Sequence, residues 1–579
     1  MSQPRWILPD LPPAEVARLA GELAIGLPAA RVLYGRGLRQ ADRARAFLHP
    51  DLASLHDPRL LLGMDAALDR VSRAIRAGEK ILIYGDYDVD GTTSVVILKT
   101  AIELAGGVAE FHVPHRLKDG YGMRPEVVEE AARAGVRLIV SVDTGIRAAQ
   151  VVERAAELGI DVVITDHHLP EAELPPAVAV LNPNRPGCGY PEKNLCGVGV
   201  AFKLVQGLME SFDWPAEKIR RITESFLKLV AIGTVADVVP LTGENRVIVK
   251  YGLDGLNKVR NPGLRALLDV AGFSATIPTA TQVAFRIAPR INAAGRMDTA
   301  NAVIELFLTK DVDRARALAT QLHELNTERQ QAEADTVDAC LQLPFAETQA
   351  ALVYCGENWH RGVLGIVASR VVERYHRPTF VLSRTPEGLA QGSGRSIHNF
   401  HLLEALESMP ELFLKFGGHT HAAGLTMRAD RVDEFRARFD AYAASKLMPE
   451  DFLPRLEIDA LIDFAEIHDR AVEEIFRLAP FGCGNPAPVF AALNAEVLAP
   501  PQIWKEKHLK LAIRQNGRNM SLKAWNFAER ASELSPGRRI DAAFAFEEDS
   551  YWASQGGQPW NAVLRNFRPA AQEQQAANA

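Results

Sequence analysis

The residues best suited to chemistry lie in the segment ILIYGDYDVDGTT, residues 81–93. An apolar run typical of a buried strand leads directly to Asp86, Asp88 and Asp90, and Gly91 then marks a turn into a helix. Carboxylates this close repel one another, which costs stability unless a cation neutralises them. The segment therefore predicts a cation site at the end of a strand.

Three further segments place similar side chains at the ends of predicted elements. Asp143 follows a strand in SVDTG, and Asp237 lies at a helix end in IGTVADVVP. The segment TDHH, which follows another strand, holds Asp166, His167 and His168. Residues beyond the carboxyl ends of parallel strands meet in one crevice, and carboxylates with imidazole suit Mn²⁺ or Mg²⁺. One such aspartate can simply cap a helix, but four clusters together favour metal binding.

An arginine-rich segment indicates an anion site. Arg286, Arg290 and Arg296 lie between Gln282 and Met297 with no carboxylate among them. Guanidinium groups without acidic neighbours are suited to phosphate. The alternative is a set of scattered surface arginines, but the stretch is also apolar and contains glycine, which predicts partial burial.

A second basic segment spans residues 358–400, which carry six arginines against two glutamates. The motif GGHTHAAG (417–424) follows, with small residues that let a backbone approach a phosphate closely and with His419 able to donate to it. A glycine-rich loop alone is weak evidence for a phosphate site.

A parallel sheet is expected to position the acids. Between residues 80 and 240, short apolar runs alternate with stretches rich in Ala, Glu and Arg. The runs lie at 81–86, 110–114, 137–143, 161–166 and 177–182. This alternation predicts βαβ units whose sheet is covered on both faces. A second α/β region is expected at 350–445.

Residues 312–342 contain no Gly or Pro and consist mostly of strong helix formers. Ala315, Leu318, Leu322 and Leu325 form an apolar stripe at helical spacing. A single helix of this length would measure about 45 Å. Two interpretations are open, a coiled-coil hairpin arm and a helix that bridges two lobes, and the second is favoured.

A small β-barrel is expected after Pro454. Strand-like segments lie at 455–460, 489–498, 508–525, 539–547 and 561–567. The region also holds Trp504, Trp525, Trp552 and Trp560. These aromatic side chains either fill the core or stack on bases above a basic groove, as in an OB-fold. The second interpretation is favoured by the nearby basic residues Lys505, Lys507, His508, Lys510, Arg514, Arg518 and Lys523.

Composition is that of a soluble globular protein with several domains. The chain has 579 residues, 47% hydrophobic and 24% charged, with a net charge of -7. That charge excludes a uniformly basic nucleic-acid binder but not a local basic channel. The sequence shows no membrane-spanning run and no secretory signal pattern. Its five cysteines include no CxxC pair, which is typical of reduced thiols, so a cytoplasmic protein is expected.

The motifs together resemble a known family. DYDVDG, VDTG, TDHH and VAD, in this order, are similar to the four signature motifs of the DHH phosphoesterase superfamily. The second α/β region resembles the DHHA1 domain that accompanies the metal domain in that superfamily. CGVGVAFKL (196–204), APRINAAGRM (288–297) and the surrounding sequence resemble the bacterial RecJ family of single-strand-specific exonucleases over nearly the whole chain.

The resemblance implies two divalent cations, Mn²⁺ or Mg²⁺, with Asp143 as the bridging ligand. Asp88 would bind one ion, and Asp86 would lie close by as an additional ligand or act through a water. The ligands of the other ion would be Asp90, His167 and Asp237.

The roles of the remaining TDHH residues follow from the same resemblance. His168 would contact the scissile phosphate, and Asp166 would orient the two histidines. The two ions would activate a water for in-line attack on phosphorus and stabilise the charge that develops. No side-chain nucleophile is required.

A substrate surface is also implied. In the DHHA1 region the phosphate-binding residues would be Arg361, Arg370, Arg395, Ser396 and His419. In the arginine-rich motif they would be Arg286, Arg290, Asn292 and Arg296. Two facing lobes would form a cleft whose narrowness could exclude duplex.

The expected fold class is α/β. A parallel-sheet DHH domain and a smaller α/β DHHA1 domain are joined by a long helix and followed by a C-terminal OB-fold β-barrel. The expected segments are a helical lead-in at 1–70, the catalytic DHH domain at 71–240, a helical extension at 241–311, the connecting helix at 312–345, the DHHA1 domain at 346–447, the OB-fold at 455–570 and a flexible tail at 571–579.

The function implied by resemblance is a metal-dependent exodeoxyribonuclease that degrades single-stranded DNA 5′ to 3′, releasing 5′-mononucleotides in DNA repair and recombination. An alternative is a nano-RNA or cyclic-dinucleotide phosphodiesterase, or a pyrophosphatase, of the same superfamily, although such relatives usually lack the barrel and the long helix. A non-enzymatic replication scaffold is disfavoured because every ligand is present. The expected partners are single-stranded DNA, single-stranded-DNA-binding protein and a recombination helicase, and a monomer is expected.

Overall fold

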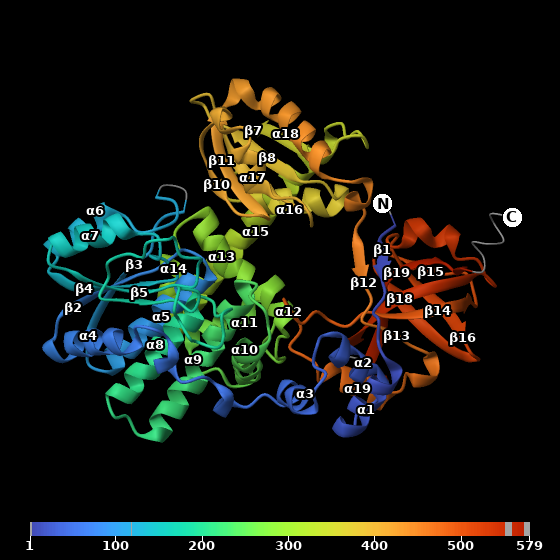
Figure 1. The fold of residues 1–579 in the computed structure, drawn as a ribbon, viewed down its shortest axis with the longest axis horizontal. Helices are drawn as coiled ribbons and strands as arrows, with labels where there is room; N and C mark the ends of the chain where they lie inside the picture. Colours follow the sequence, from blue (N-terminus) through green and yellow to red (C-terminus); the bar gives the residue numbers. More distant parts are fainter. Residues whose placement is uncertain (1–2, 117–118, 550–557, 572–579) are drawn as a thin grey trace. The chain divides into compact units, whose positions relative to one another are not determined.

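The acid-bearing segments lie in the first of two compact units. The computed structural model describes residues 3–116, 119–549 and 558–571. Among these described residues, the first unit takes those of 52–452 with 482–484, and the second takes those of 3–51, 453–481 and 485–571 (Figure 1).

A parallel sheet with the strand order β3-β2-β4-β5-β6 forms the centre of the first unit. Its strands are β2 (Lys80–Tyr84), β3 (Val108–His112), β4 (Val136–Val142), β5 (Asp161–Thr165) and β6 (Ala179–Leu181). They coincide with the apolar runs of the sequence because both faces of the sheet are buried. The chain turns from β2 to β3 on one side and continues at β4 on the other. β2 and β4 therefore flank a switch point, where ligand crevices form.

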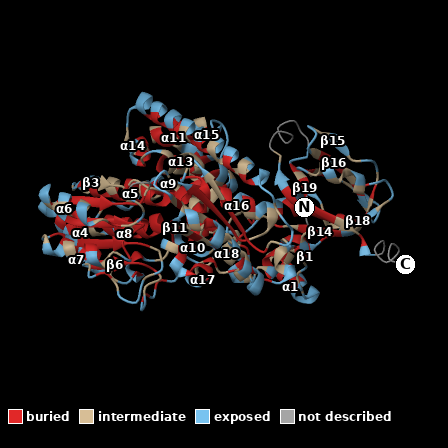
Figure 2. Cartoon of the chain, turned by 90° about the horizontal axis from the view of Figure 1, so that it is seen from above, coloured by how far each residue is buried: buried red, intermediate tan, exposed pale blue. Residues whose placement is uncertain are grey.

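Helices cover both faces of this sheet. One face packs against α4 (Met64–Ala77), α5 (Val89–Leu104) and α8 (Gly197–Ser211), and the other against α6 (Pro125–Arg133) and α7 (Ala149–Glu157) (Figure 1). Figure 2 shows buried residues concentrated around α5 and α8. α9 (Ala216–Ala236) and α10 (Gly243–Gly255) pack together next to α5 and α8. α5 is thus enclosed, which explains its apolar sequence.

A helical extension leads to the long connecting helix. It comprises α11 (Pro262–Val270), α12 (Ala280–Gln282), a π-helical turn (Val283–Ile287), α13 (Ala288–Met297) and α14 (Asn301–Leu308). α15 (Val312–Gln342) follows as one unbroken helix of 31 residues, capped by Asp311, whose side chain accepts the N–H groups of Asp313 and Arg314. α15 packs against α11, α13 and α14 and also against α16 (Leu364–Tyr375). The bridging helix is confirmed, and the hairpin arm is not formed.

The second α/β region has the strand order β10-β11-β9-β8-β7. β7 (Leu352–Glu357) and β8 (Thr379–Arg384) are parallel, and β9 (Leu389–Arg395), β10 (Phe413–Gly418) and β11 (Ala422–Arg428) continue the sheet antiparallel. One face packs on α16 and the other on α17 (Leu402–Glu407) and α18 (Val432–Lys446). Aromatic side chains of α18 pack edge-on against Phe380 of β8.

The second unit contains the predicted barrel, with the strand order β13-β14-β18-β19-β17-β16-β15. Its strands are β13 (Ala460–Leu461), β14 (Phe490–Val497), β15 (Gln502–Trp504), β16 (His508–Gln515), β17 (Arg518–Ala524), β18 (Arg539–Glu548) and β19 (Trp560–Pro569). Pairing of β14 with β16 closes a ring of β14, β18, β19, β17 and β16, and the short strands β13 and β15 extend it at β14 and β16. The predicted segment 508–525 is a hairpin, because Asn516 and Gly517 adopt positive φ at its turn.

The helical lead-in expected over residues 1–70 is divided between the two units. β1 (Arg5–Ile7) pairs in parallel with β12 (Arg455–Glu457). The apolar faces of α1 (Pro13–Leu23), α2 (Leu27–Gly35) and α3 (Ala41–Leu48) join the barrel core together with α19 (Asp469–Phe476). Amphipathic helices do not reveal in their sequence which core will bury them, so this division was not predicted.

None of the helices in the described part of the chain combines the length and the apolar character needed to cross a membrane.

Candidate metal centre

The loop between β2 and α5 presents three carboxylates at the switch point. A Cβ on Gly91 would lie 2.5 Å from the carbonyl oxygen of Asp86, so only glycine fits there. Asp88 caps α5 by accepting the N–H of Gly91 at 3.0 Å. Asp90, in the first turn of α5, accepts the N–H groups of Gly197 at 2.5 Å and of Val198 at 2.7 Å. The N-terminus of α8 thus fixes the carboxylate of Asp90, as its dipole favours.

Asp143 follows β4 in an unusual backbone conformation. Its φ of 60° lies in the left-handed region, which aspartate tolerates better than most residues. A Cβ on Gly197 would lie 2.5 Å from the Cβ of Asp143 and 2.6 Å from its Oδ1. The glycine at the start of α8 therefore allows the buried carboxylate of Asp143 to occupy its position.

Asp166 holds the two histidines that follow β5. This buried carboxylate accepts the N–H groups of Ile146 at 2.9 Å and of His167 at 2.8 Å, and its Oδ1 lies 2.7 Å from Nδ1 of His168. Side-chain amides of the segment after β6 add support, because Asn182 donates to the carbonyl of His168 and Asn184 to that of His167.

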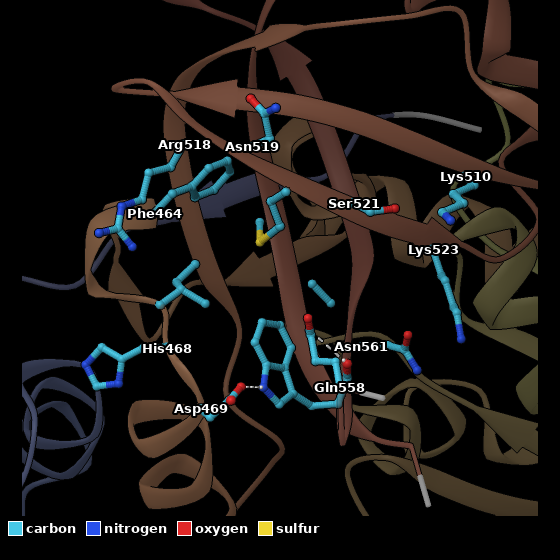
Figure 3. A pocket seen from close by; sticks show the side chains of 14 residues that line it. Phe464, His468, Asp469, Lys510, Arg518, Asn519, Ser521, Lys523, Gln558 and Asn561 are labelled. Carbon is cyan, nitrogen blue, oxygen red and sulfur yellow. Dashed lines mark hydrogen bonds between the residues drawn. The ribbon is translucent and has the colours of Figure 1, made fainter. Parts of the chain in front are cut away.

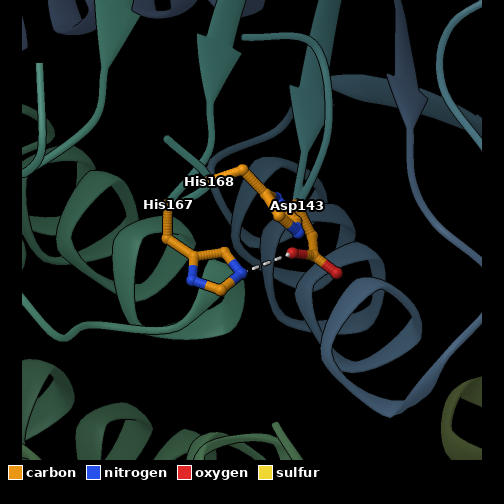
Figure 4. Close-up of side chains that lie close together, drawn as sticks. All are labelled: Asp143, His167 and His168. Carbon is orange, nitrogen blue, oxygen red and sulfur yellow. Dashed lines mark ion pairs between the residues drawn. The ribbon is translucent and has the colours of Figure 1, made fainter. Parts of the chain in front are cut away.

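Nε2 of His167 lies at the centre of the carboxylates. It is 3.2 Å from Oδ1 of Asp143, 3.8 Å from Oδ2 of Asp90 and 3.7 Å from Oδ2 of Asp237, which ends α9. Figure 4 shows the contact with Asp143. Donor atoms of Asp90, His167 and Asp237 lie within 4.8 Å of one another, as do those of Asp86, Asp88 and Asp143 and those of Asp143, His167 and His168. Asp143 therefore lies next to both ligand groups.

Burial makes the charged forms of these acids costly. Burial and Asp88 raise the pKa of Asp90 to about 7. Burial with Asp90 and Asp88 raises the pKa of Asp237 to about 9. Burial also raises the pKa of Asp143 and of Asp86. It lowers the pKa of His167 to about 4, so the imidazole is neutral at neutral pH and carries a lone pair.

Several ligand-type atoms lack a hydrogen-bond partner. Nε2 of His167 and Oδ1 of Asp143 are 3.2 Å apart but do not have hydrogen-bond geometry. Both are buried and unpaired among the described residues, as are Oδ1 of Asp86 and Oδ2 of Asp237. Buried oxygen and nitrogen atoms left unpaired around a common space are costly unless a cation occupies that space. This donor set fits Mn²⁺ or Mg²⁺.

Three guanidinium groups lie close to that of Arg296 near the acid loop. Burial and the charges of Arg116, Arg329 and Arg395 lower the pKa of Arg296 to about 10, and burial and Arg116 also lower the pKa of Arg395. Arg296 donates to the carbonyl of Gly362 at 3.0 Å and Arg395 to that of Gly394 at 2.8 Å. Arg329 pairs with Glu333, but Arg296 and Arg395 donate to carbonyls, so these two cations form a site where an anion would be stabilised.

The arginine-rich motif does not form a single surface. α13 packs against the acid loop, because Gly295 lets the carbonyl of Tyr87 approach and Asn292 accepts the N–H of Val89 at 3.2 Å. Arg286 instead donates to the carbonyl of Ala271 at 2.6 Å and lies over the ring of Phe273. Arg290 donates to the carbonyl of Arg286. Arg296 is thus the arginine of this motif that joins the cluster.

The other predicted substrate residues occupy different environments. Arg361 is exposed just before α16. Arg370 forms ion pairs with Glu333 at 3.2 Å and with Glu373 at 3.1 Å. The hydroxyl of Ser396 donates to the carbonyl of Phe400 at 2.7 Å. His419, in the turn between β10 and β11, is close enough to Arg395 for that charge to help burial and His421 lower its pKa.

A pocket of about 940 Å³ connects the histidines to the second α/β region. It is lined by His167 and His168 on one side and by Gly418 and His419 on the other. Tyr121 and Leu169 contribute apolar surface to its wall. The predicted cleft between two lobes therefore corresponds to a pocket within the first unit.

Sequence reasoning missed two residues of the loop after β3. Arg116 belongs to the guanidinium cluster and lies 4.9 Å over the ring of Tyr87. The hydroxyl of Tyr121 lies 3.2 Å from Nδ1 of His168. Their position along the chain could have indicated them. Both residues follow the predicted strand 110–114, and loops that follow parallel strands lie at the same sheet edge as the acids.

The barrel presents aromatic and basic side chains on its surface. The rings of Trp504, His508 and Trp525 lie 5.0 to 5.6 Å apart, and Trp525 is 44% exposed. Trp560 is buried and donates to Asp469 at 2.9 Å, whereas Trp552 lies outside the described residues. A separate pocket of about 600 Å³ is lined by basic and by apolar side chains (Figure 3). The basic lining residues are Lys510, Arg518 and Lys523, and the apolar ones include Phe464, Met520 and Trp560.

Comparison with known families defines the class of the protein. Residues 80–234 match the DHH family, N-terminal domain, and residues 347–445 match the DHHA1 domain. The first unit therefore has the architecture of a DHH-superfamily phosphoesterase. Residues 458–558 match the RecJ OB domain.

Whole-chain relatives make the assignment more specific. The single-stranded-DNA-specific exonuclease RecJ of Bacillus subtilis is 38% identical over 93% of this chain and 68% of its own length. That of Dickeya dadantii is 40% identical over 86% of this chain and 88% of its own length. RecJ of Thermus thermophilus in complex with Mn²⁺ superposes with a TM-score of 0.83 and 32% identity, covering 97% of this chain and 79% of that one. The same protein has been solved with Mg²⁺. The chain belongs to the RecJ family, which confirms the resemblance inferred from its motifs.

Proposed function

We propose that the protein is a metal-dependent exonuclease specific for single-stranded DNA that releases 5′-mononucleotides in the 5′-to-3′ direction. The observation that carries the proposal is a pair of ligand groups that meet at Asp143, with unpaired buried donor atoms directed at a common space. The RecJ relatives, named for this activity, support the substrate class, so the alternative of a small-nucleotide phosphodiesterase is not favoured.

Asp88 and Asp143, with Asp86 close by, would hold one divalent cation. Asp143 would share the other with Asp90, His167 and Asp237. Mn²⁺ or Mg²⁺ bound there would supply Lewis-acid stabilisation of the charge that develops on the phosphate oxygens.

His168 is assigned to the scissile phosphate. Burial alone would lower its pKa, but the hydrogen bond and charge of Asp166, with Asp90 and Asp88, outweigh burial and raise it. The imidazole is therefore suited to donate a hydrogen bond to a phosphate oxygen, and Asp166 orients the ring.

The guanidinium cluster is assigned to the phosphates of the strand. Arg296 and Arg395, together with Arg116, concentrate positive charge, and the first two donate to backbone carbonyls rather than to carboxylates. The other proposed contacts are Arg361, Ser396, His419, Arg290 and Asn292. The internal contacts of Arg286 and Arg370 favour a structural contribution from these two residues.

The barrel, within residues 455–570, would bind the single strand through stacking and backbone charge. The exposed ring of Trp525 and the pocket lined by Lys510, Arg518 and Lys523 support this role. The catalytic and phosphate-binding domains would span 71–240 and 346–447. We also propose that the protein is a cytoplasmic monomer that acts in DNA repair and recombination with single-stranded-DNA-binding protein and a recombination helicase.

The test uses the full chain with Mn²⁺ and end-labelled substrates. Single-stranded DNA with a 5′ label should release labelled mononucleotide at once, while blunt duplex and dinucleotides should be cleaved far more slowly. Asp143→Ala should abolish cleavage and leave DNA binding largely intact. Faster cleavage of dinucleotides than of single strands would contradict the proposal, as would substantial activity in Asp143→Ala.

A further inference from the structure

Tyr121 contacts the histidine assigned to the scissile phosphate. It lies between Gly120 and Gly122, whose φ values of 80° and 103° are in the left-handed region. Its hydroxyl oxygen is 3.2 Å from Nδ1 of His168 and 3.4 Å from the carbonyl oxygen of Asp143. The residue is about half exposed, at 52%, and its ring packs edge-on against the imidazole of His168 with 5.5 Å between the centroids. Both the ring and the hydroxyl therefore contact His168, and the variants Tyr121→Phe and Tyr121→Leu separate the two contributions.

Asp166 determines the direction of these hydrogen bonds. Its carboxylate accepts the N–H groups of Ile146 and His167, and it lies 2.7 Å from Nδ1 of His168. An ionised carboxylate can only accept, so Nδ1 of His168 carries the hydrogen. The hydroxyl of Tyr121 therefore cannot donate to Nδ1. Instead, the Nδ1–H of His168 forms a hydrogen bond that is shared between Asp166 and the hydroxyl oxygen of Tyr121. The O–H of Tyr121 donates to the carbonyl of Asp143.

This arrangement connects two parts of the site that no backbone segment joins directly. The carbonyl belongs to Asp143, whose carboxylate lies next to both ligand groups and whose φ is 60°. The imidazole belongs to His168, whose Nδ1 is occupied by Asp166 and Tyr121, so Nε2 is the nitrogen available to a substrate.

We propose that Tyr121 is a positioning residue whose hydroxyl fixes the imidazole of His168 relative to Asp143. A phosphate bound beside Asp143 then meets Nε2 of His168 without reorganisation of the ring. The inference rests on the proposed function, because it assumes that His168 contacts the phosphate. No proton is transferred by Tyr121, and no bond to it forms or breaks.

Tyr121→Phe tests the hydroxyl while keeping the ring. A small misplacement of a reacting group can cost about a hundredfold in rate, and loss of one secondary hydrogen bond should cost less, so we expect kcat to fall about tenfold with KM nearly unchanged. Tyr442→Phe, the same chemical change on α18, is the matched control and should leave both constants unchanged. An unchanged kcat in Tyr121→Phe with a large loss in Tyr121→Leu would overturn the proposal and assign the ring to base stacking beside Leu169.

A double variant that also lacks the imidazole of His168 separates a positioning role of Tyr121 from a general structural effect. In His168→Ala the group that the hydroxyl orients is gone, so adding Tyr121→Phe should change the residual kcat less than about twofold. The same tenfold loss in both backgrounds would show that the hydroxyl acts without His168 and would overturn the inference.

A spectroscopic measurement distinguishes failure of this inference from failure of the proposed function. In the full-length protein loaded with Mg²⁺ and labelled with ¹⁵N-histidine, the Nδ1–H proton of His168 can be assigned by its loss in His168→Ala. Tyr121→Phe should shift this proton, whereas Tyr442→Phe should not. An unshifted signal would refute the contact even if the wild-type protein degraded no DNA, and a shifted signal without nuclease activity would leave the contact standing and refute the function.

Discussion

The first residue of α8 offers a sharp test of how the shared carboxylate is held. Gly197 has an ordinary backbone conformation, so alanine is not excluded there by φ and improves helix propensity by about 0.8–1.0 kcal/mol. The built Cβ, however, lies 2.5 Å from the Cβ of Asp143 and 2.7 Å from its Cγ. Because carbon atoms in contact prefer about 3.5–4.0 Å, Gly197→Ala must move the side chain of Asp143 by about 1 Å.

Such a displacement should affect the reaction much more than the fold. Overpacking costs about 1–3 kcal/mol, and the gain in helix propensity offsets part of that cost. A misplacement of about 1 Å can reduce the rate by about a hundredfold. We therefore predict that Gly197→Ala folds with a modest loss of stability, binds Mn²⁺ more weakly and loses about 99% of kcat on single-stranded DNA.

Gly199→Ala is the matched control two residues along the same helix. The three atoms nearest to its added Cβ would all belong to the side chain of Leu195, the closest at 3.3 Å, and this side chain can give way. The assay compares kcat, the Mn²⁺ concentration at half activity and the urea midpoint of both variants with those of the wild type. If Gly197→Ala retained activity within about threefold of Gly199→Ala, the close approach of α8 to Asp143 would not matter for the site.

Three further predictions concern the phosphate surface, the barrel and the metal-free protein. Arg395→Gln should raise KM for DNA and lower the slope of log binding constant against log salt concentration by about one unit. Arg314 pairs with Glu305, so the control Arg314→Gln should change neither quantity. Trp525→Ala should cost about 1–3 kcal/mol of binding to single-stranded DNA in titrations, because an exposed ring can stack on a base. Phe544→Ala should instead lower the unfolding midpoint, because that ring is buried in the barrel core. Without metal, stability should fall as pH rises from about 4 to about 7 for Asp90 and to about 9 for Asp237, because over these ranges the folded carboxyl groups retain protons that the unfolded chain has lost. The urea midpoint should therefore be lower at about pH 9 than at about pH 5, and saturating Mn²⁺ should remove the difference.

The sequence predicted the sheet and the acids because both leave local signals. Strands buried on two faces are continuous apolar runs, and each acid follows such a run or ends a helix, so position along the chain was enough to bring Asp90, Asp143 and Asp237 together. The single helix α15 was predictable for a similar reason, since its residues have high helix propensity without interruption.

Other features depend on contacts between distant segments. The carboxylate of Asp90 is fixed by backbone N–H groups of α8, more than a hundred residues away, and backbone groups leave no trace in residue type. The grouping of Arg286 with Arg296 was misleading because Arg286 lies in the π-helical turn and Arg296 near the end of α13, and Arg286 donates to the carbonyl of Ala271. Tyr121 could not be distinguished from any other loop tyrosine until His168 was placed beside it.

Diffraction from a crystal soaked in Mn²⁺ tests the central claim most directly, because anomalous scattering locates each ion without reference to activity. Two peaks about 3.5–4 Å apart are predicted. One should lie among Asp86, Asp88 and Asp143, and the other among Asp90, His167 and Asp237, with Asp143 between them. A single peak at saturating Mn²⁺, or two peaks that do not share Asp143, would contradict the account.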